Sequence, residues 1–262
     1  MTFESLQGQM LAYTLLLPRF ISCFVMLPVL SKQMLGGAMI RNGVVCSLAL
    51  FAYPMVADTL PPTIDALDLA LLVAKEVLLG LLIGFVAAIP FWAVEASGFL
   101  VDNQRGAAMA SLFNPSLASQ TSPTGLLLTQ TLITLFFSGG AFLALLSALF
   151  QSYASWPVTR FFPAIGDLWV SFFYSQFSQM LLICALLAAP LLIAMFLAEF
   201  GLALISRFAP SLNVFVLAMP IKSAVASLLL VIYIKLMMDH AYGQVLAVMD
   251  PLRLLAPILE PR

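Results

Sequence analysis

The sequence predicts an all-α integral membrane protein, and three observations carry this prediction. Of the 262 residues, 63% are hydrophobic and only 9% are charged, against roughly 25% charged in an ordinary soluble domain. The apolar stretches are long, and they lack the period-two alternation of a lipid-facing β-strand. Since a helix satisfies its own backbone hydrogen bonds inside a membrane, helices are the expected spanning elements.

The same composition excludes several classes of function. A net charge of −1 gives no electrostatic attraction for nucleic acid, and no polybasic run is present to grip lipid headgroups. Membrane lipid is an expected partner of the apolar spans. Three cysteines in apolar runs and a single histidine, His240, predict no disulfide and no metal site. With no phosphate-binding loop or catalytic motif either, we expect neither a cofactor nor an enzymatic activity.

Six apolar runs are long enough to cross a hydrocarbon core of roughly 30 Å, which takes about 20 helical residues. They cover residues 10–30, 39–57, 69–94, 126–150, 178–205 and 212–238. The turn between the last two runs is short and contains Pro210. We therefore expect these two helices to form a tight antiparallel hairpin.

The separators between the runs differ in kind. Residues 31–38 contain two adjacent glycines, and residues 58–68 are acidic with two adjacent prolines. Residues 151–177 are rich in tryptophan, phenylalanine and tyrosine, which predicts an interfacial segment. Residues 239–262 end in a leucine-rich stretch flanked by charges, which predicts a short amphipathic tail.

Prolines and charges interrupt the apolar runs. Each proline removes one backbone hydrogen bond, so kinked helices are expected at Pro28, Pro90, Pro190 and Pro220. Each buried charge costs roughly 2.5 to 3.5 kcal/mol if it faces lipid at a helix centre. The charges must therefore reach a span end, pair with one another, or face a polar or protein interior. The charges in question are Arg19, Lys75, Glu76, Glu199, Lys222 and Lys235.

Two of these charges lie at similar heights in the expected hairpin. Glu199 and Lys222 differ by about 4.5 Å at 1.5 Å per helical residue. They are suited to pairing with each other, but pairing with another subunit or lining an aqueous path stays open. In the third run, Gly80 and Gly84 have the GxxxG spacing that lets another backbone approach closely, unless the two glycines are incidental.

Residues 101–125, the central segment, are unlike the rest of the chain. They read VDNQRGAAMASLFNPSLASQTSPTG, with only two charges, Asp102 and Arg105, among small, polar and scattered apolar residues. A connector exposed to water would carry more charge, so this composition indicates a segment packed inside something. Asp102 and Arg105 are spaced to pair along a helix, or to contact neighbours.

The central segment and several other stretches resemble one known family. Residues 101–111 are followed by Asn114-Pro115 and by QTSPTG at 120–125, and further matching stretches are LPRF at 17–20, LPVLSK at 27–32, EFGLALISRFAP at 199–210 and NVFVLAMPIKS at 213–223. Together they resemble the SctT family, the inner-membrane export-apparatus proteins of bacterial type III secretion systems, which are related to the flagellar protein FliR. The DNQRG form resembles the virulence injectisome branch rather than the flagellar one, and the sequence as a whole is most similar to the Ysc-type subgroup.

This resemblance implies a fold and a set of partners. It implies one subunit of an export gate in the bacterial inner membrane, assembled with SctR and SctS, with SctU and SctV as further partners and unfolded secreted proteins as cargo. It also implies an SctR-like helical region at 1–177, an SctS-like helical hairpin at 178–238, and a tail at 239–262.

The resemblance further implies that the central segment plugs the closed channel. Met109 and Phe113 are suited to blocking a narrow channel, while Pro115 and Pro123 prevent one continuous helix. The residues assigned to the plug are Asp102, Asn103, Gln104, Arg105, Gly106, Met109, Leu112, Phe113, Asn114, Pro115, Gln120, Ser122 and Pro123. Those assigned to intramembrane charge and assembly are Arg19, Glu76, Glu199, Arg207 and Lys222.

Two other functions stay open at this point. A secondary transporter also uses broken helices and buried charges. Transporters usually show paired halves, however, and Pro90 and Pro190 do not fall at matching places in two halves. A static membrane scaffold would make the central segment a fixed, buried connector.

Overall fold

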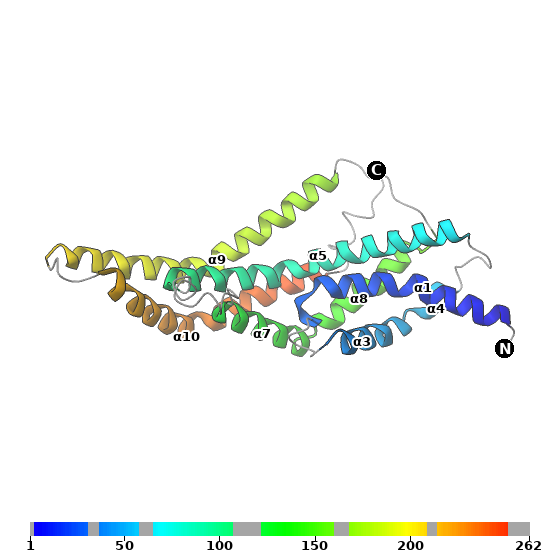
Figure 1. Cartoon of the computed structure of the whole chain (residues 1–262), viewed down its shortest axis with the longest axis horizontal. Helices are drawn as coiled ribbons and strands as arrows, with labels where there is room; N and C mark the ends of the chain where they lie inside the picture. The colour runs from blue at the N-terminus through cyan, green and yellow to red at the C-terminus, as the bar shows by residue number, and fades with distance from the viewer. Residues whose placement is uncertain are drawn as a thin grey trace. The chain divides into compact units, whose positions relative to one another are not determined.

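The structure is a computed structural model that describes residues 3–30, 37–57, 65–106, 122–159, 168–208 and 214–250. Every element within these ranges is helical (Figure 1), which confirms the all-α prediction. In chain order the elements are α1 (Phe3–Met26), the 3₁₀ helix η1 (Pro28–Leu30), α3 (Ala38–Leu50), α4 (Tyr53–Ala57), α5 (Ala66–Arg105), α7 (Pro123–Ser138), α8 (Ala141–Ser155), α9 (Leu168–Ser206) and α10 (Val214–Met249).

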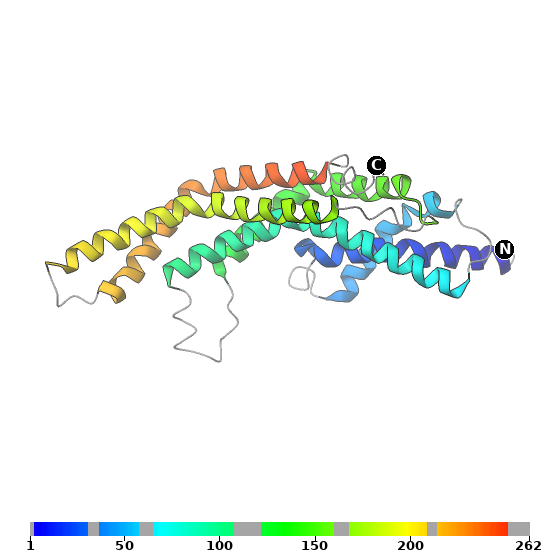
Figure 2. The same cartoon turned by 90° about the horizontal axis from the view of Figure 1, so that it is seen from above.

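The chain divides into two compact units. Unit 1 comprises residues 1–89, 137–176 and 245–262, and unit 2 comprises residues 90–136 and 177–244. Helices α5, α9 and α10 each contribute to both units, and so does the end of α7. Within unit 2, α9 and α10 run side by side (Figures 1 and 2), as the predicted hairpin requires.

Fewer helices than predicted are long enough to span a membrane. Among the described residues, α5, α9 and α10 pass by length and apolarity, and α7 with α8 would make a fourth if they form one broken span. Residues Met10–Met26 and helix α3 are shorter apolar helices. Of the six predicted apolar segments, three or four therefore pass this length test within the described ranges, and the others appear there as shorter apolar helices.

Two of the predicted apolar runs, 39–57 and 126–150, are each divided into two helices at residues that disturb the helical backbone. Pro54 has no amide to donate to the Leu50 carbonyl, so α3 ends at Leu50 and the chain re-enters a helix only at Tyr53. The run at 126–150 breaks at Gly139 and Gly140, and Gly140 has a φ of +84°, which a residue with a side chain rarely adopts.

Several helices extend beyond the apolar runs that predicted them. Helix α5 continues to Arg105 rather than ending near residue 94, because nothing between residues 95 and 105 breaks a helix. Helix α9 begins at Leu168, inside the expected interfacial segment, and α10 continues to Met249, past the predicted boundary at 239. Residues 160–167 and 251–262 lie outside the described ranges.

The prolines have two different effects. Pro28 ends α1 and begins η1, so the kink expected there is instead a helix end. Pro90, Pro190 and Pro220 lie inside α5, α9 and α10, and Figure 1 shows bends within α9 and α10. Pro18, inside α1, belongs to the same class.

In unit 1, α1 and α5 pack backbone to backbone at the two glycines of the GxxxG spacing. A Cβ added at Gly80 would overlap the Ser22 hydroxyl and the Arg19 carbonyl, and one added at Gly84 would lie 2.5 Å from the Cys23 carbonyl oxygen. The glycines therefore mark an intimate helix contact, which brings the α1 and α5 charges within reach of each other.

Candidate functional site

The central segment is bracketed by the end of α5 and the start of α7, both in unit 2. Residues 107–121 lie outside the described ranges. Six of the predicted plug residues fall there, namely Met109, Leu112, Phe113, Asn114, Pro115 and Gln120. The structure therefore describes the two ends of the segment, and the geometry of these ends is specific.

Asp102 joins the two ends of the central segment. Its Oδ1 accepts hydrogen bonds from the Arg105 guanidinium and, at 2.7 Å, from the Thr124 hydroxyl. Its Oδ2 accepts from the Ser122 hydroxyl at 2.6 Å and from the Thr124 backbone N–H at 2.9 Å. Arg105 also donates to the Thr124 hydroxyl at 2.6 Å. We call Asp102, Arg105, Ser122 and Thr124 the Asp102 cluster. Asp102 is 2% exposed. Its hydrogen bonds reach residues twenty and twenty-two positions further along the chain.

The sequence at the start of α7 explains why these donors face a carboxylate. Ser122 precedes Pro123, the first helical residue, and its hydroxyl accepts from the Gly125 N–H at 2.9 Å, as an N-cap does. The first backbone N–H groups of a helix have no partner within it, and the N-terminus favours negative charge. Asp102 supplies that charge from α5.

Two glycines let the ends approach this closely. A Cβ at Gly98 on α5 would overlap the backbone of Gly125 on α7, so α5 and α7 touch backbone to backbone one turn from the Asp102 cluster. Gly106 ends α5 with a φ of +98° and donates its N–H to the Asn103 carbonyl at 3.0 Å. The left-handed conformation at Gly106 lets the chain leave the helix there.

Helix α10 also contacts this end of α5. A Cβ at Gly106 would lie 3.3 Å from Met219 Cγ, next to Pro220. Asn103 is exposed, Gln104 is half-buried and Pro123 is exposed. The described part of the predicted plug therefore separates into a buried set that fixes the ends and a set that faces outward.

The α9–α10 pair contains the ion pair that was one of the sequence-based alternatives. Lys222 Nζ donates to Glu199 Oε2 at 3.1 Å, with 11% of the lysine and 43% of the glutamate side chain exposed. At another level Gln179 donates to Gln244 at 3.3 Å. The pairing within the chain is thus confirmed, whereas Arg207, just beyond the end of α9, is exposed.

Unit 1 contains a second, fully buried group of charges. The Arg19 guanidinium on α1 makes two bonds to the Glu76 carboxylate on α5, at 2.6 and 3.0 Å. It also donates to the Ser152 hydroxyl at 2.9 Å and to the Trp156 carbonyl at 3.2 Å. Its carbon Cζ lies 3.9 Å from the centre of the Tyr153 ring. The guanidinium therefore has acceptors on α5, on α8 and directly after the end of α8.

Lys75 completes this group, which we call the Arg19 cluster (Arg19, Lys75 and Glu76). Lys75 Nζ lies 2.9 Å from Glu76 Oε1 and donates to the carbonyls of Val158 at 2.7 Å and Pro157 at 3.3 Å. The cluster holds two cations and one carboxylate, and the carbonyls that follow α8 offset the excess positive charge. It therefore ties α1, α5 and the end of α8 together.

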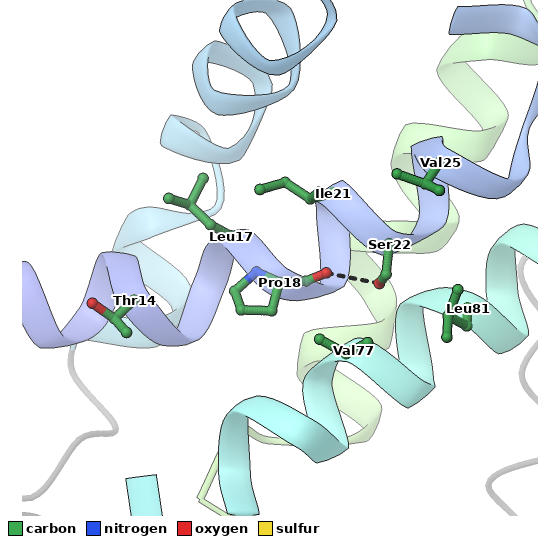
Figure 3. A pocket seen from close by; sticks show the side chains of 8 residues that line it. All are labelled: Thr14, Leu17, Pro18, Ile21, Ser22, Val25, Val77 and Leu81. Carbon is green, nitrogen blue, oxygen red and sulfur yellow. Dashed lines mark hydrogen bonds between the residues drawn. The ribbon is translucent and has the colours of Figure 1, made fainter. Parts of the chain in front are cut away.

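Unit 1 also has an apolar groove between α1 and α5, of about 570 Å³. Figure 3 shows Thr14, Leu17, Pro18, Ile21, Ser22 and Val25 lining it from α1, and Val77 and Leu81 from α5. Its two hydroxyl groups already donate to backbone carbonyls, Thr14 to Met10 and Ser22 to Pro18. The groove offers hydrocarbon contact and no reactive group.

No metal site is present in the described ranges, where no three His, Cys, Asp or Glu residues group together. Sequence reasoning missed Thr124, although a Ser-Pro-Thr start signals a capped helix and hence a partner for an acidic residue.

Known proteins match this chain over nearly its whole length. Residues 10–247 match the family described as bacterial export proteins, family 1. The chain is 72% identical over 260 residues to Yop proteins translocation protein T of Yersinia pestis, covering 99% of this chain and 100% of that protein. It is 35% identical over 224 residues to secretion system apparatus protein SsaT of Salmonella typhimurium (85% and 86% covered). It is 28% identical over 223 residues to flagellar biosynthetic protein FliR of Bacillus subtilis (84% and 85% covered). The chain therefore belongs to family 1 of the bacterial export proteins.

Proposed function

We propose that this chain is a nonenzymatic pore subunit of the type III secretion export apparatus in the bacterial inner membrane. Its proposed partners are SctR and SctS, with SctU and SctV nearby, and its proposed cargo is unfolded secreted protein. Family membership, the names of the relatives and the three long apolar helices support this role. The α9–α10 pair corresponds to the proposed SctS-like hairpin, and the helices before it to the proposed SctR-like region.

Within this role, residues 101–125 close the resting channel. The observation that carries this proposal is the Asp102 cluster, because one buried carboxylate binds both ends of the segment. A mere connector needs no such fixation, whereas a stopper must be held in one place against passing solute. A closed loop whose ends are fixed also loses less entropy when it is ordered.

The experiment replaces residues 108–119 with a Gly/Ser sequence of the same length in cells that assemble the whole apparatus. This replacement keeps the connection between α5 and α7 and removes Met109, Leu112 and Phe113. We expect the resting cells to leak small solutes several-fold faster than cells with the unaltered chain, and we expect the particle to remain assembled.

A second variant tests the ends rather than the stopper. Asp102→Asn leaves residues 103–121 unchanged but weakens charge-assisted hydrogen bonds worth about 1.5 to 3 kcal/mol each. We expect a smaller leak than with the replaced segment. If both variants assemble and neither leaks, the central segment is a static connector and the gating role is wrong.

A further inference from the structure

One side chain from α10 lies directly against the point where the central segment leaves α5. A Cβ added at Gly106 would lie 3.3 Å from Cγ, 3.5 Å from Sδ and 3.8 Å from Cε of Met219, so the methionine side chain extends along the glycine. Gly106 has a φ of +98° and is the described residue that precedes residues 107–121. Met219 therefore lies beside the backbone at the exit of the segment.

This contact supplies what the Asp102 cluster lacks. Arg105 fixes the end of α5 through Asp102 and Thr124. Gly106, the next residue, has no side chain with which to join the cluster, and many backbone conformations are open to a glycine. A flexible methionine that fills the space beside Gly106 restricts those conformations.

The position of Met219 depends in turn on the Glu199–Lys222 pair. Residues three apart are neighbours on a helix surface, and Lys222, three residues after Met219, donates to Glu199 on α9 at 3.1 Å. Pro220 lies between them in α10 and has no N–H for the Val216 carbonyl, so the first turn of the helix lacks one backbone bond. The ion pair therefore fixes α10 within one turn of Met219.

We propose that Met219 is a positioning residue for the central segment, which restricts Gly106 and makes the Glu199–Lys222 pair part of what holds the segment in its closing position. All four residues lie in unit 2. The proposal rests on the proposed function, in which residues 101–125 close the channel. It adds that the α9–α10 pair controls how firmly this segment is held.

The test follows hydrogen–deuterium exchange of residues 100–106 by mass spectrometry in the assembled particle with the full chain. Met219→Ala removes the side chain beside Gly106, so we expect several-fold faster exchange there and unchanged exchange at residues 84–95 of the same helix. Met219→Leu has a similar volume and should keep most of the protection. Leu217→Ala, on the same turn of α10 and 43% exposed, is the matched control and should leave exchange unchanged.

Glu199→Gln tests the coupling, because it removes one charge of the ion pair and keeps the size of the side chain. In the otherwise unaltered chain it should speed both the exchange of residues 100–106 and the resting leak. Combined with Met219→Ala it should add nothing to either, since the pair then has no side chain through which to act. Lys222→Met breaks the same pair from α10 and should give the same pattern.

Three results would each overturn the proposal. They are equal exchange in Met219→Ala and Leu217→Ala, additive effects in the double variants, and no leak from Met219→Ala when the replaced central segment does leak. The exchange measurement does not depend on the leak, so it still decides the role of Met219 if the replaced segment fails to leak. A leak from the replaced segment with normal exchange in Met219→Ala would support the gating role and contradict this positioning role.

Discussion

At the residue scale, the Arg19 cluster shows how charge balance decides which buried side chains matter. The bidentate Arg19–Glu76 pair is neutral by itself, and Lys75 adds one positive charge that only backbone carbonyls offset. Removing one partner of a buried pair typically costs about 3 to 5 kcal/mol, because an uncompensated charge stays behind. The cost should therefore depend strongly on which of the three residues is changed.

We predict that Glu76→Gln destabilises the protein by about 3 to 5 kcal/mol, since it leaves two adjacent cations without a carboxylate. Lys75→Met should cost much less, because the Arg19–Glu76 pair remains neutral and the methionine has a similar length. The measurement is the thermal unfolding midpoint of the purified particle in detergent. Equal midpoints for the two variants would show that charge balance does not govern this cluster.

The residue scale also shows what the sequence could and could not predict. Buried charges in apolar runs pointed to pairing, and spacing within one hairpin was enough to anticipate Glu199–Lys222. The partners of Arg19 lie 57 to 137 residues away, so no local spacing could find them. Asp102 and Arg105 were identified by their spacing, whereas Thr124 required knowing that α7 begins beside α5.

At the scale of helices, apolarity predicted the existence of the elements better than their ends. The long apolar runs predicted α5, α9 and α10, but each helix extends past its run into more polar residues. Polar residues do not end a helix, whereas a proline or a glycine can. The positions that do end helices were available in the sequence as Pro28, Pro54 and the Gly139-Gly140 pair. Hydrophobicity alone could not show that these residues divide runs that otherwise look continuous.

Close packing of α5 against α7 near the Asp102 cluster depends on Gly98, which has no side chain. Gly98→Ala would place a methyl group on the Gly125 backbone, so we predict a loss of about 1 to 3 kcal/mol from overpacking. Gly243→Ala in α10 meets nothing within 4 Å and should instead gain about 0.5 to 1 kcal/mol from helix propensity. Opposite shifts in the unfolding midpoint are expected, and shifts of the same sign would contradict close α5–α7 packing.

At the scale of the whole molecule, the two units contain different groups of charged residues. The Arg19 cluster and the groove lie in unit 1, while the Asp102 cluster and the Glu199–Lys222 pair lie in unit 2. Helix α5 contributes to both units, so the first end of the central segment belongs to the same continuous helix that binds Arg19. The same helix therefore serves fold stability through Glu76 and, in the proposed function, gating through Asp102.

The molecule also exposes more apolar surface than a self-sufficient protein would. In the most apolar stretch of each helix, only 11% of α10 and 33% of α9 are buried within the chain, against 67% of α5. Val231 on α10 is 78% exposed, and Ile232 is 71% exposed. Lipid covers apolar surface as well as protein does, so exposure alone does not choose between them. The Glu199 side chain on α9 is 43% exposed, which favours a protein neighbour there, because a charge facing lipid is costly.

We therefore predict that the chain is stable only within a larger particle. Expressed with SctR and SctS homologues and solubilised in mild detergent, it should co-elute with both in one high-mass peak. Expressed alone at the same level, it should aggregate or be degraded, because the α9 and α10 faces then lack their partners. A charge reversal at Glu199 should reduce co-elution more than the same reversal at Asp68, which lies in the first turn of α5. A monodisperse, stable single chain would show that lipid is a sufficient neighbour for α9 and α10, and it would contradict the expectation that these helices face other subunits.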